Sequence, residues 1–145
     1  MVASITLVVG GKINGTPEEK IINNYQKRIR WPIKTLELKP SITNPESAFE
    51  KAMQGVPIWI ALDENGDNLT SLKFSTLIST CLEKHTNIGF LIGIDTGIPK
   101  NILDKCHHKI SFGQMTWPHL LARVLLIEQL YRAGQIIIGH PYHKI

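Results

Sequence analysis

The sequence of 145 residues contains little of what marks several common protein classes. It has only two cysteines, Cys81 and Cys106, which are too few for a disulfide scaffold and show no spacing typical of a metal site. No run of 18 apolar residues is present, so we expect no membrane span. The N-terminus also lacks the basic leader and long apolar stretch of a signal peptide. These absences favour a cytoplasmic protein with reduced thiols and no bound metal.

The composition is that of a globular protein, with 43% hydrophobic and 19% charged residues. The length predicts a single domain over residues 1–145. The formal net charge of +4 is unevenly distributed, because residues 1–98 hold ten basic and ten acidic residues. Residues 99–145 hold six basic and two acidic residues, together with five of the six histidines. A basic C-terminal third suits a phosphate-rich partner.

Apolar strand patterns alternate with amphipathic helix patterns along the chain. We expect strands at 5–9, 33–38, 58–62, 88–93 and 109–112, and helices at 16–30, 44–53, 71–84 and 99–105. This alternation predicts an α/β fold, with a mostly parallel sheet and helices on both faces. Ligands of such sheets bind beyond the carboxyl ends of the strands, here in the loops after Leu62, Ile92 and Ser111. We interpret the acidic segment 63–67 as a solvated turn. The alternative is a pair of carboxylates that binds a metal or acts as acid and base.

A long helix should begin at Pro118 and stop before Gly134. It is apolar nearly all round, so one side can meet the sheet while the other needs a partner. We therefore expect a homodimer formed through the helix at 118–133. Glu128 and Arg132 are spaced as an i,i+4 ion pair, although Arg132 also suits an anion. Residues 135–138 fit either a strand or a continuation of the helix.

The segment 111–133 reads Ser-Phe-x-x-Met-Thr-x-Pro-His-x-x-x-Arg-Val-x-Leu-x-Glu-Gln-x-Tyr-Arg-Ala, and residues 141–144 read Pro-Tyr-His-Lys. This pattern closely resembles the RlmH family of ribosomal RNA methyltransferases, which belong to the SPOUT class, and the resemblance runs from Ile5 to the tail. It implies a SPOUT-type α/β knot, with a deep C-terminal trefoil. It also implies methylation of N3 of a pseudouridine in 23S ribosomal RNA on the ribosome, with S-adenosylmethionine as the cofactor.

The same resemblance assigns roles to individual residues. On the substrate side, His119 and His143 are candidate bases together with Glu128. Arg132 would hold a phosphate or a developing negative charge, and Tyr142 would stack on a base. The implied cofactor-binding residues are Leu62, Gly93, Phe112, Gly113, Gln114, Met115, Thr116 and Trp117.

One position departs from the family pattern. The family usually has Ile-Gly-Gly-x-x-Gly after the fourth strand, whereas this chain has Ile94 in place of the second glycine. A branched side chain there removes tolerance for positive φ and puts the tightness of cofactor binding in doubt. The alternative function is therefore a non-enzymatic RNA-binding homologue that has lost its cofactor. A small-molecule nucleotide-binding enzyme is a third option, but Gly10-Gly11-Lys12 is a poor phosphate loop.

Overall fold

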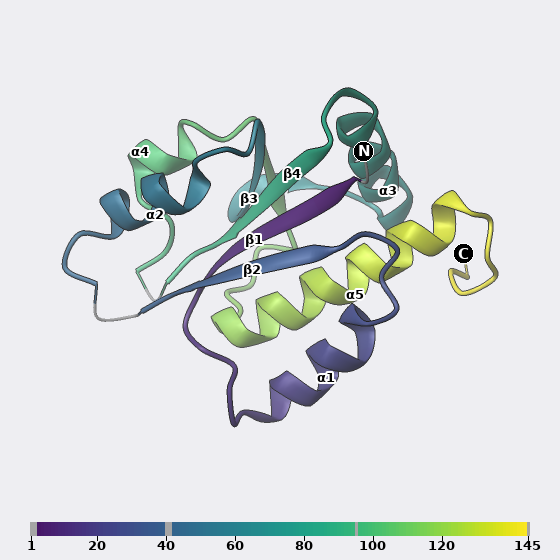
Figure 1. Ribbon diagram of the computed structural model, residues 1–145, viewed down its shortest axis with the longest axis horizontal. Coiled ribbons are helices and arrows are strands. Elements are labelled where there is room, and N and C mark those ends of the chain that lie inside the picture. The colour runs from purple at the N-terminus through teal and green to yellow at the C-terminus, as the bar shows by residue number, and fades with distance from the viewer. Residues whose placement is uncertain (1–2, 40–41, 95, 145) are drawn as a thin grey trace.

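A computed structural model describes residues 3–39, 42–94 and 96–144. Within these residues, five strands form one parallel sheet in the order β2-β1-β4-β3-β5 (Figure 1). The strands are β1 (Ser4–Gly10), β2 (Ile33–Leu38), β3 (Ile58–Asn68), β4 (Asn87–Ile92) and β5 (His108–Ser111). The inner strands β1 and β4 are almost wholly buried, which explains their continuous apolar sequences.

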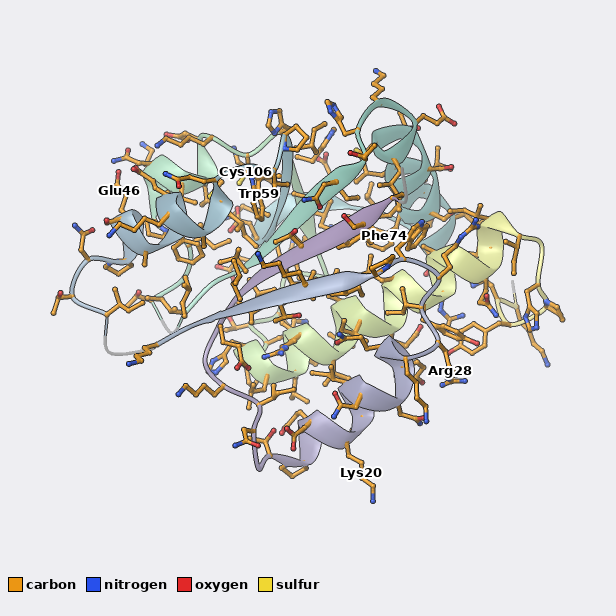
Figure 2. The ribbon with its side chains drawn as sticks, viewed as in Figure 1. Lys20, Arg28, Glu46, Trp59, Phe74 and Cys106 are labelled. Atoms are coloured by element: carbon orange, nitrogen blue, oxygen red, sulfur yellow. The ribbon has the colours of Figure 1, made fainter. Side chains whose placement is uncertain are left out.

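Helices cover both faces of the sheet, as the sequence predicts. α1 (Pro17–Gln26), α3 (Ser71–Lys84) and α5 (His119–Ile137) lie on one face, where α5 packs between the other two. α2 (Pro45–Met53) and α4 (Lys100–Leu103) lie on the other, and Figure 2 shows Trp59 and Cys106 on that side. Successive residues of β1 alternate between the two cores: Leu7 and Val9 pack under α5, whereas Val8 packs with Phe49 of α2.

The strand order creates a crevice at one edge of the sheet. The chain leaves β1 through α1 on one face and leaves its neighbour β4 through α4 on the other. Because the two connections diverge, a gap opens beyond the carboxyl ends of these strands. The ends of β3 and β5 reach the same edge, so the three loops expected to bind a ligand meet there.

Most expected elements agree with the structure to within two residues, including the cap of α2, where the Asn44 side chain accepts a hydrogen bond from the Ser47 N–H at 3.2 Å. The helix expected to reach Arg30 instead ends at Gln26. Beyond it, the N–H groups of Arg28 and Ile29 bond three residues back, to Tyr25 and Gln26. This tightening comes just before Trp31-Pro32, where helical backbone is disfavoured.

The prediction that Gly134 stops the long helix is wrong. α5 continues through Gly134 to Ile137, so residues 135–137 are helical. Gly134 is buried, and a Cβ there would lie 3.3 Å from the Cγ and Cδ atoms of Arg30. Its lack of a side chain therefore allows close packing at this point. The chain turns out of the helix at Gly139 (φ +74°), where the N–H groups of Gly139 and His140 bond to the Ile136 and Gln135 carbonyls as in a Schellman motif.

The interpretation of residues 63–67 as a turn is also wrong. β3 runs on to Asn68, with an irregularity between Leu62 and Asp67, and both residues pair with Ile110 of β5. Gly66 makes this extension possible, because a Cβ at that position would lie only 2.6 Å from the Lys109 backbone. The acidic segment is thus held against the sheet edge, next to the crevice.

Candidate cofactor pocket and tail cluster

The crevice contains a cavity of about 740 Å³. Residues 62–64 of β3, the loops after β4 and β5, and the start of α5 form its walls. Seven of the eight residues predicted to bind the cofactor line it: Leu62, Gly93, Phe112, Gly113, Met115, Thr116 and Trp117. Gln114 is exposed and is not among the lining residues. The structure thus brings three separate segments of the chain to one cavity, although the first of them is part of β3 and not the loop expected after Leu62.

The loop after β5 is stabilised by its own hydrogen bonds. The Ser111 hydroxyl accepts from the Gly113 N–H at 3.0 Å and donates to the Gly113 carbonyl at 2.7 Å. Gly113 has a φ of +105°, a conformation that residues with a side chain rarely adopt. The Trp117 indole donates to the Phe112 carbonyl at 3.3 Å and closes the loop. These contacts give the loop a defined shape, with its apolar side chains at the cavity.

The loop after β4 accommodates Ile94 without positive φ; among the described residues, only glycines have it. Ile94 is 8% exposed, and its carbonyl accepts a hydrogen bond from the Gly97 N–H at 2.7 Å. Its side-chain Cγ2 lies 2.8 Å from where Gly10 would carry a Cβ. The branched side chain therefore occupies space left by a glycine of β1. Ile94 contributes to the cavity wall but leaves the cavity open.

Two carboxylates belong to this cavity, and our reading of a solvated turn missed them. Asp63 and Glu64 are lining residues, and Glu64 accepts a hydrogen bond from the Thr116 hydroxyl at 3.4 Å. Among the described residues that line the cavity, none is Lys or Arg. The signal was available in the sequence, since both acids directly follow the carboxyl end of a buried strand. An acidic cavity on a chain of net charge +4 suits a ligand that carries positive charge.

His119 also lines the cavity, at the first position of α5. A Cβ on Gly11 would lie 2.5 Å from the His119 Nε2 atom, so the imidazole packs directly on this glycine of the loop after β1. One turn along, Arg123 is 4% exposed, and its Nη1 donates to Glu37 at 2.6 Å. The same Glu37 oxygen accepts from the Ile13 N–H at 3.0 Å. This network joins the start of α5 to β2 and to the loop after β1.

The network changes the acidity of Glu37. Burial raises the pKa of this carboxyl, but the hydrogen bonds from Arg123 and Ile13 outweigh burial and bring the pKa below its usual value. The carboxylate is therefore charged at neutral pH and balances the buried guanidinium. An arginine this deeply buried on a helix requires such a carboxylate partner.

Arg132, Tyr142 and His143 form a second group, which we call the tail cluster. Arg132 makes the predicted ion pair with Glu128 through two hydrogen bonds, of 2.7 and 3.2 Å. Its Nη1 lies 3.1 Å from His143 Nδ1. Its guanidinium carbon lies 4.8 Å from the centre of the Tyr142 ring, which contacts the Tyr131 ring edge-on. The last described residues are thus packed against α5.

The tail cluster also determines proton positions. A guanidinium only donates hydrogen bonds, so His143 Nδ1 must accept, and a neutral imidazole then carries its proton on Nε2. Burial and a hydrogen bond with Tyr25 raise the pKa of Tyr142 to about 12, so its phenol is protonated at neutral pH.

The structure does not bring all four predicted catalytic residues together. His119 lines the cavity, whereas Arg132 lies thirteen positions further along α5. At 1.5 Å per residue, the two are about 20 Å apart. Figure 1 shows the tail folding back beside the C-terminal end of α5, which is the end away from the cavity. Within one copy, the cavity and the tail cluster are separate.

Comparison with known proteins identifies the family. A family model described as "Predicted SPOUT methyltransferase" matches residues 3–143. A ribosomal RNA large subunit methyltransferase H from Erythrobacter litoralis is 36% identical over 146 residues, which covers 95% of this chain and 96% of the relative. This agrees with the resemblance to the RlmH family.

Two solved structures share the fold. A probable methylase family protein from Haemophilus influenzae has a TM-score of 0.62 at 10% identity and covers 99% of this chain and 70% of its own. The SpoU methyltransferase AviRb from Streptomyces viridochromogenes, solved in complex with AdoMet, has a TM-score of 0.51 at 12% identity, over 96% of this chain and 59% of its own. Because the family model spans nearly the whole chain and the Erythrobacter relative aligns over 96% of its own length, the chain belongs to the SPOUT methyltransferase family.

Proposed function

We propose that this protein transfers a methyl group from S-adenosylmethionine to N3 of a pseudouridine in 23S ribosomal RNA. The observation that carries the proposal is the acid-lined cavity formed by β3 and the loops after β4 and β5, in a chain that belongs to a methyltransferase family. The relatives named as large-subunit ribosomal RNA methyltransferases, which align along the whole chain, support this choice of substrate.

The residues around the cavity fit the cofactor. Leu62, Ile92 and Phe112 provide apolar surface for an adenine ring, and Gly93 and Gly113 let backbone groups approach a ligand closely. S-adenosylmethionine, when bound, supplies a methyl group on a positively charged sulfur. Asp63 and Glu64 match that charge and the charge of the cofactor's ammonium group. These residues would hold and orient the cofactor.

The tail cluster fits the substrate side of the reaction. N3 of a neutral pseudouridine carries a proton that must leave, so negative charge develops on the base. Arg132 is suited to stabilise this charge, since its ion pair with Glu128 holds the guanidinium in place. The His143 Nε2–H is a donor for the base carbonyls in this conformation. His119, at the cavity, is then the better candidate base.

We propose that two copies assemble the active site. If the α5 helices of two copies pack antiparallel, the cavity of one copy lies next to the tail cluster of the other, although the two are far apart within one copy. Apolar side chains at the start of α5 support this: Trp117 is 43% and Leu121 42% exposed. The trefoil knot implied by the family and a cytoplasmic location belong to the same proposal. Among the described residues, no helix is long and apolar enough to cross a membrane.

The non-enzymatic alternative rested on Ile94 closing the cavity. The packing of this side chain against Gly10, with the cavity still open, removes that reason. The proposed function is tested by titrating the purified protein with S-adenosylmethionine in a calorimeter. Ribosomes from a strain lacking the protein then serve as substrate, with mass spectrometry of the 23S RNA. Micromolar binding and appearance of N3-methylpseudouridine are expected. Absence of cofactor binding at millimolar concentration would refute the proposal.

A further inference from the structure

A basic segment lies outside the C-terminal third of the sequence. Between Glu19 and Glu37 the chain carries five basic residues and no acidic one: Lys20, Lys27, Arg28, Arg30 and Lys34. All five are exposed. The neutral charge total of residues 1–98 hides this segment, because the balancing acids lie elsewhere. The simplest role for Lys27 and Arg28 is a favourable interaction with the dipole at the C-terminal end of α1.

The structure places part of this segment against the tail cluster. The Arg28 guanidinium carbon lies 4.8 Å from the Tyr131 ring centre and 5.3 Å from that of Tyr25 (Figure 2). The Tyr25 and Tyr131 rings are themselves 5.8 Å apart. Arg30 packs its side-chain carbons over Gly134 of α5. Figure 2 shows Lys20 pointing away from α5, whereas residues 27–30 follow directly after the end of α1.

Five cations thus gather where the end of α1 meets the end of α5. We call them the basic face: Lys27, Arg28, Arg30, Arg132 and Lys144. The tail brings Lys144 there, because the adjacent His143 contacts Arg132. The acid on the second half of α5 is Glu128, and both of its carboxylate oxygens bond to Arg132. The positive charge of the remaining four residues is therefore not balanced by this carboxylate.

We propose that the basic face binds the phosphate backbone of RNA beside the target nucleotide. The inference rests on the proposed function, because the tail cluster, which would receive the base, borders this face. Aromatic contacts hold Arg28 in place before any RNA arrives, which lowers the entropy lost on binding a phosphate. RNA that enters the tail cluster must continue past it, and α1 supplies cations along that path. The α1 end therefore extends the binding surface beyond the C-terminal third.

Charge neutralisation tests this surface directly. In the double variant Lys27→Gln/Arg30→Gln, glutamine keeps side-chain carbons equivalent to those of Arg30 that contact Gly134. The matched control is Lys51→Gln/Lys100→Gln, which removes the same charge from exposed positions of α2 and α4, on the other face of the sheet. Affinities for a labelled hairpin RNA and for purified large ribosomal subunits are measured from 50 to 200 mM KCl.

Each lost phosphate contact lowers the slope of log affinity against log salt by about 0.7 to 0.9. We expect the double variant to lower the slope by about 1.5 on both probes, with the control unchanged. Equal slopes for the two double variants would overturn the proposal. A slope that decreases for ribosomal subunits but not for hairpin RNA would also overturn the proposal, and would point to an acidic ribosomal protein as the partner of this face. If the double variant does not fold, Lys27→Gln alone should lower the slope by about 0.8.

Calorimetry with S-adenosylmethionine separates this inference from the proposed function. The double variant should bind the cofactor like the wild type, because residues 27 and 30 do not line the cavity. If the wild type itself does not bind the cofactor but the slope changes as expected, the proposed reaction fails and the RNA surface stands.

Discussion

The ion pair between Arg123 and Glu37 offers a quantitative test of the link between α5 and the sheet. The change Glu37→Gln removes the negative charge but keeps the side-chain shape, and it leaves a guanidinium that is only 5% exposed without a counter-charge. Removal of one partner from a fully buried pair costs about 3 to 5 kcal/mol. The Glu37 side chain is 29% exposed, and glutamine can still accept a hydrogen bond, so we expect about 2 kcal/mol.

The assays are urea unfolding and thermal unfolding, each monitored by circular dichroism. A loss of about 2 kcal/mol should lower the melting temperature of a chain of this size by about 6 °C and shift the urea midpoint with an unchanged slope. The control is Glu50→Gln, which breaks the exposed pair of Glu50 with Lys105, where the side chains are 46% and 55% exposed. That change should cost at most about 0.5 kcal/mol.

The pH dependence checks the cause. Because the pKa of Glu37 is lowered in the folded state, its contribution to stability is complete above the unfolded-state pKa of about 4.3. The contribution is lost as the pH falls through the lowered folded value. The stability gap between wild type and Glu37→Gln should therefore be constant from pH 5 to 8 and shrink below about pH 4. A cost equal to that of Glu50→Gln, or a gap that does not change with pH, would refute the reasoning.

Three further predictions concern the cavity and the proposed dimer. Glu64→Gln should weaken binding of S-adenosylmethionine about five-fold in calorimetry. Binding of S-adenosylhomocysteine, whose sulfur is uncharged, should weaken less, and equal losses for the two ligands would argue against a charge effect. Gly11→Ala should cost more unfolding free energy than Gly15→Ala by over about 1 kcal/mol, since both have positive φ but only Gly11 contacts His119, and equal costs would contradict this packing. Leu121→Glu should convert a dimer to monomers in analytical ultracentrifugation, whereas a dimer that survives would place the interface elsewhere.

Local sequence signals predicted the elements whose ends depend on neighbouring residues alone. The helix from Ser71 to Lys84 is capped by Thr70, and the strand from Ile33 to Leu38 has the bounds expected from its apolar pattern. Gly134 misled the prediction because its surroundings come from Arg30 and Trp31, a hundred positions away in the chain. Glycine preferences at helix ends carry no information about such tertiary contacts.

The site was predictable in part. The pattern of alternating elements placed three loops at one edge of the sheet, and the family resemblance named the residues now found around the cavity. Asp63 and Glu64 could have been predicted from their place directly after a buried run, but the extension of β3 could not, because it depends on Gly66 lying against the Lys109 backbone. The separation of His119 from the tail cluster was not predictable either, since it depends on how far α5 continues and how the tail folds back.

The pairing of β1 with β4 has a consequence for synthesis of the chain. These two strands form the middle of the sheet, yet Ser4 pairs opposite Asn87. A nascent chain therefore holds an apolar β1 with one edge unpaired until most of the sequence has been made. α5, which covers β1 and packs on α1 and α3, is translated last of all the helices. Such non-local contacts slow folding and expose strand edges, so we expect the emerging chain to depend on chaperones until its C-terminal helix is released.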